Sequence, residues 1–239
     1  MSKIVENLEQ VESNIADACA KSKRGREEVT LVVVTKTASP EAIKEVVRAG
    51  CCDLGENKVQ HLKLVHDEIA QFLSDKSNGE NLPSEVRWHM IGHLQRNKAR
   101  SVLKMSSFVH SVDTLRLAEE VSKTAEKLKI TPSILLQVNC SQEPQKYGVP
   151  VGAAIHLAEQ IVTMPNIRVA GIMTMGPLTR DEDLIRASFI RAHEIFEEIK
   201  AAGVCGKYFK HLSMGMSNDY EIAVEEGATI LRVGSAIFK

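Results

Sequence analysis

No apolar run in the 239-residue sequence approaches membrane-spanning length, and the start of the chain lacks the apolar core of a signal peptide. The formal net charge is -1 and the pI is near 6.7, which argues against a broad nucleic-acid-binding surface. Cysteine is scarce, and without a CxxC pair it indicates neither a disulfide framework nor a zinc site; the residues are Cys19, Cys51, Cys52, Cys140 and Cys205. These absences predict a cytoplasmic protein without membrane or nucleic-acid partners.

What the sequence does contain is an ordinary globular composition, 44% hydrophobic and 26% charged, and a conspicuous buried strand that ends in a lysine. In the stretch TLVVVTK at 30–36, four consecutive apolar residues are typical of a parallel strand covered on both faces. Barrels place their chemistry at the carboxyl ends of such strands, so Lys36 is a candidate Schiff-base nucleophile. A solvent-exposed lysine without a role is the alternative, because charged residues are mostly exposed.

Strand and helix patterns alternate along the whole chain. Apolar residues at helical spacing predict a helix over 3–21 and later helices that begin near residues 40, 58, 95, 113, 151, 181 and 218. The predicted strands are 30–36, 52–57, 86–92, 108–112, 134–139, 167–175, 208–213 and 229–233. This pattern predicts a single-domain (β/α)₈ TIM barrel over 1–239, with a doubly wound sheet as the alternative. The polar stretch 74–85 is predicted to be a surface loop.

Two loops at the expected ends of the last strands have the composition of phosphate-binding loops. SMGMSN at 213–218 precedes a predicted helix, and VGSA at 233–236 follows a predicted strand. Barrels of this kind commonly hold phosphate in the loops after strands seven and eight, through backbone N–H groups. Either loop alone is also ordinary turn chemistry. Together with Lys36, they predict a phosphorylated ligand whose other end is an aldehyde.

Other kinds of site have little support in the sequence. His89 and His93 are four residues apart but straddle a predicted strand end, and neither an HExxH glutamate nor a third ligand accompanies them. We therefore expect no metal site. The sequence contains no GxSxG motif, so acyl-transfer catalysis has no support either.

Six motifs, taken together, resemble the pyridoxal phosphate homeostasis protein family. They are VTK at 34–36, LGEN at 54–57, WHMIGHLQRNK at 88–98, GIMTMGP at 171–177, SMGMS at 213–217 and RVGSAIF at 232–238. Members of this family look like the barrel half of alanine racemase standing alone, a fold type III barrel. The resemblance implies a protein that binds pyridoxal 5′-phosphate (PLP) and serves intracellular vitamin B6 and amino-acid homeostasis, with no established catalytic turnover.

The resemblance also implies roles for individual residues. Lys36 carries PLP as a Schiff base in this interpretation, and the phosphate end is held by Ser213, Gly234 and Ser235 with Arg232 nearby. The predicted cofactor site comprises Lys36, Asn57, Ser213, Met214, Gly215, Ser217, Arg232, Gly234 and Ser235, with no catalytic and no metal-binding residue. The implied partners are PLP and PLP-dependent apoenzymes, and the predicted state is a monomer.

A PLP-dependent amino-acid racemase is the alternative function. Racemisation needs an acid or base on each face of a carbanion, and in alanine racemases the second one is a tyrosine from a separate domain of the partner subunit. In this sequence only Tyr147 is expected near the barrel mouth, so we expect no racemisation. The sequence departs from the family pattern at Lys58, His61 and Lys239, which affects local loop contacts.

Overall fold

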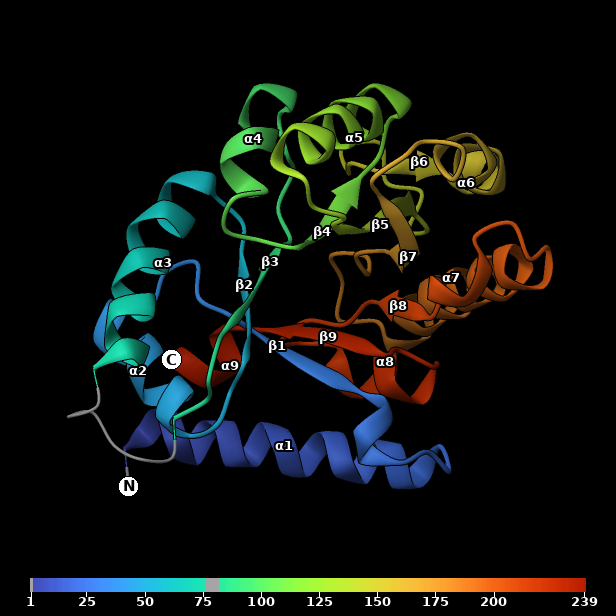
Figure 1. Ribbon diagram of the computed structural model, residues 1–239. Helices are drawn as coiled ribbons and strands as arrows, with labels where there is room; N and C mark the ends of the chain where they lie inside the picture. The colour runs from blue at the N-terminus through green and yellow to red at the C-terminus, as the bar shows by residue number, and fades with distance from the viewer. Residues whose placement is uncertain (1, 76–81) are drawn as a thin grey trace.

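The computed structural model describes residues 2–75 and 82–239, and its centre is a closed barrel of parallel strands (Figure 1). The barrel strands are β1 (Thr30–Val34), β2 (Asp53–Glu56), β3 (Arg87–Met90), β4 (Phe108–Val112), β5 (Ser133–Asn139), β7 (Arg168–Met173), β8 (His211–Ser213) and β9 (Ile230–Val233). Neighbours follow the order β4-β3-β2-β1-β9-β8-β7-β5, and a further pairing of β4 with β5 closes the ring. The predicted (β/α)₈ barrel is confirmed, because a doubly wound sheet stays open at both edges.

Helices form an outer layer around the barrel (Figure 1). They are α1 (Lys3–Lys21), α2 (Pro40–Arg48), α3 (Val59–Ser74), α4 (Ala99–Val102), α5 (Leu115–Leu128), α6 (Ala154–Ile161), α7 (Glu182–Ala201), α8 (Tyr220–Glu225) and α9 (Ser235–Phe238). The helix predicted over 3–21 is confirmed at both ends, and the Ser2 side chain accepts a hydrogen bond from the Val5 N–H at its start. Ser39 caps α2 in the same way through the Ala42 N–H, ahead of Pro40 at the first helical position.

The structure differs from the sequence prediction in short segments. The helix predicted over 95–104 is a 3₁₀ turn at Arg96–Lys98 followed by the four residues of α4. A two-residue strand, β6 (Val149–Pro150), pairs with the end of β5, and α9 follows β9 directly. Neither was predicted, because two to four residues are too few to show a period. Of the loop predicted over 74–85, residues 76–81 lie outside the described residues, and Ser74 still belongs to α3.

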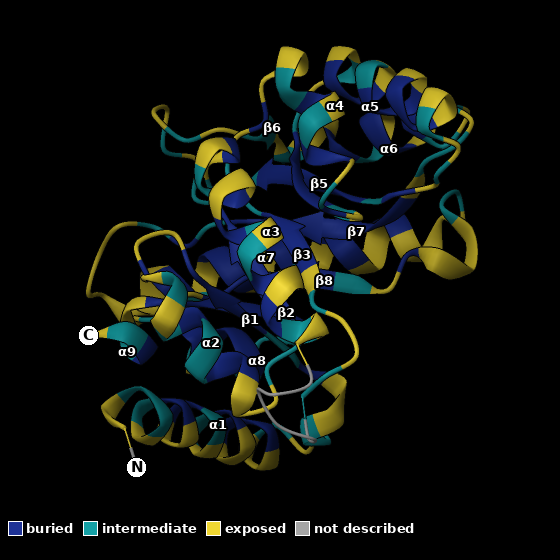
Figure 2. Cartoon of the chain, turned by 60° about the vertical axis from the view of Figure 1, so that its left-hand side comes forward, coloured by how far each residue is buried: buried dark blue, intermediate teal, exposed yellow. Residues whose placement is uncertain are grey.

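Burial follows these layers: the strands and the inner faces of the helices are buried, and the outer helix faces are exposed (Figure 2). Most of the core is apolar and lies between strands and helices. Several buried residues on the strands are polar or charged, however, and they include Asp53, His89, His110, Ser213 and Arg232. Among the helices of the described segments, none is long and apolar enough to cross a membrane.

Candidate functional site

A cavity of 520 Å³ lies where the barrel strands end at their carboxyl termini. Its size falls within the range of about 300–1,000 Å³ that small-molecule sites occupy. The segments that line it include those that follow β1, β2, β3, β5, β7, β8 and β9. The cavity brings together six of the predicted site residues: Lys36, Asn57, Ser217, Arg232, Gly234 and Ser235.

Lys36 enters the cavity from the end of β1. Its backbone is held, because the Thr35 N–H still donates to the carbonyl of Gly55 at 3.0 Å and the Thr35 hydroxyl donates to the buried carboxylate of Glu56. The Lys36 side chain is exposed and belongs to none of the ion pairs found among residues 2–75 and 82–239. A fixed backbone with an uncommitted amine suits attack on a ligand carbonyl.

Backbone amides from the loop after β9 converge on the hydroxyl of Ser217. Ser217 Oγ accepts from the N–H groups of Gly234 and Ala236, each at 3.2 Å. A Cβ on residue 234 would stand 2.8 Å from the Val34 carbonyl oxygen, so only glycine lets this loop lie against the end of β1. Convergent N–H groups with a hydroxyl form an anion-binding arrangement.

Arg232 supplies a buried positive charge to the same cavity. Its Nη1 donates to Ser213 Oγ at 2.6 Å and its Nη2 donates to the Thr174 carbonyl at 2.8 Å. Burial lowers the pKa of Arg232 to about 10, partly offset by the charge of Asp219, so the guanidinium remains protonated at neutral pH. The two hydrogen bonds fix its position at the cavity wall.

Two charged residues of the cavity, Asp219 and Lys146, were not among the predicted site residues. The Asp219 carboxylate accepts from the Met216 N–H at 2.5 Å, and burial raises the pKa of this group. Lys146, from the loop after β5, forms an ion pair with Glu143 and donates to the Gly176 carbonyl at 2.5 Å. Neither residue follows a barrel strand directly, so the position of the strand ends in the sequence does not predict that either one lines the cavity.

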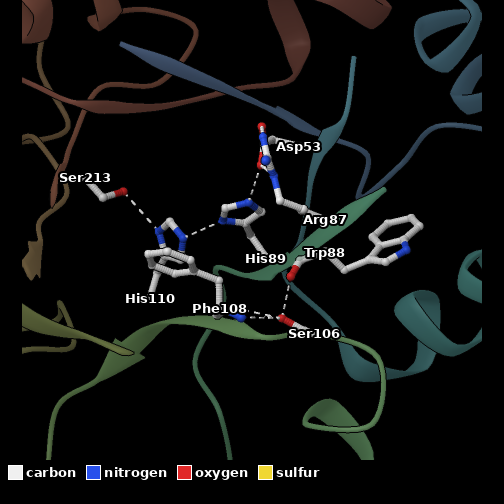
Figure 3. Close-up of polar contacts among 8 residues, drawn as sticks. All are labelled: Asp53, Arg87, Trp88, His89, Ser106, Phe108, His110 and Ser213. Carbon is white, nitrogen blue, oxygen red and sulfur yellow. Dashed lines mark hydrogen bonds and ion pairs between the residues drawn. The ribbon is translucent and has the colours of Figure 1, made fainter. Parts of the chain in front are cut away.

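Ser213, Met214 and Gly215 lie outside the cavity lining. Ser213 is the last residue of β8, and its fully buried side chain points into the barrel toward His110 (Figure 3). Met214 is also fully buried. Gly215 has a φ of +91°, and a Cβ there would stand 2.6 Å from Ala223 Cβ, so this glycine makes the turn that leads to Ser217.

Tyr147 and the histidines do not add a second reactive group to the cavity. The Tyr147 ring stacks on His93 with centroids 4.1 Å apart, remains 57% exposed and is not among the lining residues. Within the part of the chain that the structure describes, no cluster of three potential metal-ligating side chains occurs.

The arrangement as a whole fits PLP. Lys36 offers an amine for the aldehyde, and the amides of Gly234 and Ala236 with the Ser217 hydroxyl offer donors for a phosphate. The glycine at 234 keeps those amides accessible, since any Cβ there would strike Val34. The residues present therefore suit both ends of a phosphorylated aldehyde.

A family model and several known proteins are similar to this chain. The model of the alanine racemase N-terminal domain matches residues 7–239. The pyridoxal phosphate homeostasis protein of Aquifex aeolicus is 35% identical over 233 residues, which are 98% of this chain and 96% of that protein.

Solved structures show the same fold. PipY of Synechococcus elongatus, solved with PLP bound, superposes with a TM-score of 0.79 at 30% identity, over 94% of this chain and 100% of that one. An alanine racemase of Clostridium difficile gives a TM-score of 0.72 at 12% identity, over 99% of this chain and 56% of that one. At that identity the likeness to the racemase shows the fold alone.

Proposed function

We propose a function from one premise: this chain belongs to the alanine racemase N-terminal domain family and, within it, to the pyridoxal phosphate homeostasis proteins. On this premise, it binds PLP in the cavity at the carboxyl ends of the strands and takes part in vitamin B6 and amino-acid homeostasis. One observation carries the proposal. A single cavity holds an exposed lysine, convergent backbone amides and a fixed guanidinium.

Each group in the cavity has a separate part in binding. When bound, PLP supplies a carbonyl and an electron-withdrawing ring. Lys36 would hold the carbonyl carbon as a Schiff base, with the carbonyl oxygen leaving as water, and the N–H groups of residues 234–236 would donate to the phosphate. The Ser217 hydroxyl accepts from two of those amides and would donate its own proton to the phosphate. Asn57 and Arg232 would contact the ligand from the walls.

The other three predicted residues would affect PLP binding indirectly, through the cavity residues that they support. Ser213 holds Arg232 through a 2.6 Å hydrogen bond, and Met214 packs in the core beneath the turn. Gly215 gives that turn its left-handed conformation, which places Ser217 at the cavity. Loss of any of these three is expected to weaken PLP binding through the residues that they support.

We further propose that the protein holds and releases PLP and does not turn over amino acids. Racemisation needs a second acid or base opposite the lysine, and the described cavity lining contains no tyrosine. Tyr147, which follows the lining residue Lys146, is exposed and stacked on His93. Tyr220, which follows the lining residue Asp219, is buried, and its hydroxyl accepts from Asn14. A cavity open to water also deprives a carbanion of dry surroundings. PLP-dependent apoenzymes are the proposed recipients of the cofactor.

The binding proposal is tested by absorbance of the purified protein with PLP. A visible band that survives dialysis and is bleached by borohydride is the expected result. A colourless protein after dialysis would contradict PLP binding.

The second part is tested by incubation with PLP and L-alanine in deuterated water, with Lys36→Ala as the control. Slow exchange at Cα without inversion fits a carrier. Steady formation of D-alanine that Lys36→Ala removes would establish the racemase alternative.

A further inference from the structure

A line of buried polar side chains runs from Arg232 at the cavity wall across the inside of the barrel, and Figure 3 shows its part from Ser213 to Asp53. His110 on β4 bonds to Ser213 on β8, and because these strands are not neighbours in the ring, the contact crosses the barrel interior. The distances are 2.6 Å from Arg232 Nη1 to Ser213 Oγ, 3.0 Å from Ser213 Oγ to His110 Nδ1, 2.9 Å from His110 Nε2 to His89 Nδ1 and 3.0 Å from His89 Nε2 to Asp53 Oδ1. We call these five residues the interior chain.

The two ends of the interior chain set the direction of its hydrogen bonds. Arg232 can only donate, and an ionised Asp53 can only accept. With neutral histidines, every contact is satisfied when each donor points toward Asp53: Arg232 donates to Ser213, Ser213 to His110 Nδ1, His110 Nε2–H to His89 Nδ1, and His89 Nε2–H to Asp53. Both histidines then carry their proton on Nε2.

The surroundings favour a neutral His110. Burial holds the pKa of His110 well below its ordinary value, and the charge of Arg232 acts in the same direction. The Asp53 carboxylate accepts from His89 Nε2 at 3.0 Å and also pairs with Arg87 at 2.5 Å, which fixes it as the acceptor at the far end.

This geometry stabilises a charge that has no direct counter-ion. Arg232 is 4% exposed, and no ion pair among residues 2–75 and 82–239 includes it. A buried charge without an ion-pair partner is costly, and the charge of Asp219 offsets only part of the effect of burial. In the interior chain, however, the hydroxyl and both imidazoles turn their negative ends toward Arg232 and their positive ends toward Asp53. Hydrogen bonds aligned in this way polarise one another and strengthen both ends.

We propose that Asp53, His89, His110 and Ser213 are positioning residues that hold the Arg232 guanidinium in its orientation at the cavity wall. None of the four lines the cavity, so they act on a ligand only through Arg232. The identity of that ligand as PLP rests on the proposed function, but the hydrogen-bond arrangement does not. The inference therefore has a test that needs no ligand.

The first test uses NMR of the ligand-free protein. In the wild type, the side-chain ¹⁵N signals of His89 and His110 should show Nε2–H tautomers, and the Arg232 N–H groups should exchange slowly with water. Ser213→Ala removes the link next to Arg232, and Asp53→Asn removes the charge at the far end. Both should speed Arg232 exchange by about tenfold, the equivalent of one net hydrogen bond.

Ser106→Ala is the matched control. Ser106 is also buried, its hydroxyl donates to the Trp88 carbonyl at 2.6 Å, and it takes no part in the interior chain (Figure 3). Its loss should lower stability while leaving Arg232 exchange at the wild-type rate. Wild-type exchange in both Ser213→Ala and Asp53→Asn, or Nδ1–H tautomers in the wild type, would overturn the inference.

The second test measures the dissociation constant for PLP in the same variants. Ser213→Ala and Asp53→Asn should raise it about threefold or more, because a loosened guanidinium binds less well, whereas Ser106→Ala should not. Unchanged constants in both variants would contradict the positioning role. If the wild type does not bind PLP, the proposed function is wrong. The Arg232 exchange rates still test whether the interior chain holds the guanidinium in place.

Discussion

The polar groups of the cavity and those of the barrel interior are arranged in opposite ways. In the cavity, Lys36 is exposed, and Ser217 shares two amides at 3.2 Å each. In the interior, the polar atoms of His89 and His110 meet partners at 3.0 Å or less. A ligand can bind to the cavity groups without breaking hydrogen bonds that hold the barrel together. The interior groups already use their hydrogen bonds to stabilise the fold. Arg232 belongs to both regions, since it lines the cavity and ends the interior chain.

The largest expected effect is that of Lys36→Ala, which should abolish covalent PLP binding in the cavity without changing the stability of the barrel. The variant should lose the borohydride-fixed PLP adduct completely, because the lysine supplies the covalent bond, and its melting temperature should stay at the wild-type value because the side chain is exposed. Absorbance and calorimetry measure the two properties. Lys58→Ala, another exposed lysine beside the cavity residue Asn57, is the control and should keep the adduct. Retention of the adduct in Lys36→Ala would assign the bond to another lysine.

Arg232→Gln should affect both regions. Charge-assisted hydrogen bonds contribute about 1.5–3 kcal/mol, so the dissociation constant for PLP should rise by about 10- to 100-fold. Stability should fall as well, because the change leaves Ser213 and the Thr174 carbonyl without their donor. Arg186→Gln, which removes an outer arginine paired with Glu225, is the control for binding. Equal PLP retention in the two variants at matched stability would place Arg232 outside the binding site.

Acid should weaken the barrel interior by protonating Asp53. Burial alone would raise the pKa of Asp53, but hydrogen bonds from His89 and Arg87 outweigh it and lower the pKa to about 2. The folded-state pKa lies below the unfolded value, so this contribution is present above about pH 4 and is lost as the pH falls toward 2. Its size is on the order of 2 kcal/mol.

Chemical denaturation from pH 7 to pH 3 measures this contribution. The stability difference between wild type and Asp53→Asn should be constant from pH 7 to about pH 5 and shrink below about pH 4. Burial also lowers the pKa of His211 to about 4, with smaller effects of Lys210 and His89, but that loss of stability below pH 6.5 is common to both proteins and cancels. A pH-independent difference would show that Asp53 is not held ionised by its partners.

The smallest effect is expected for Ser217→Ala. A neutral hydrogen bond contributes about 0.5–1.5 kcal/mol to binding. Loss of the Ser217 hydroxyl should therefore weaken PLP binding by about two- to tenfold, with little change in stability. Ser217→Thr keeps the hydroxyl and should bind nearly as the wild type does. Isothermal titration with PLP compares the three proteins, and equal affinity of Ser217→Ala and wild type would remove the hydroxyl from the phosphate site.

The sequence alone predicted the barrel and the cavity residues that follow strands directly, because both depend on local patterns. The apolar run before Lys36 and the small residues at 233–236 carry that information in consecutive positions. Asp219 and Lys146 reach the cavity from loops whose course depends on tertiary packing. The interior chain joins residues up to 179 positions apart, between Asp53 and Arg232, and no local period reports such a contact. The family resemblance implied a place for Ser213 at the phosphate, and local sequence cannot tell whether the last residue of a strand faces the barrel interior or the cavity.

The most direct test of the central claim is to reduce the wild-type complex with borohydride and locate the modified residue by peptide mass spectrometry. We predict that the phosphopyridoxyl group lies on Lys36, the lysine that ends the β1 segment and enters the cavity. A group found mainly on Lys146 or on any lysine outside the cavity, or no modified peptide at all, would contradict the account.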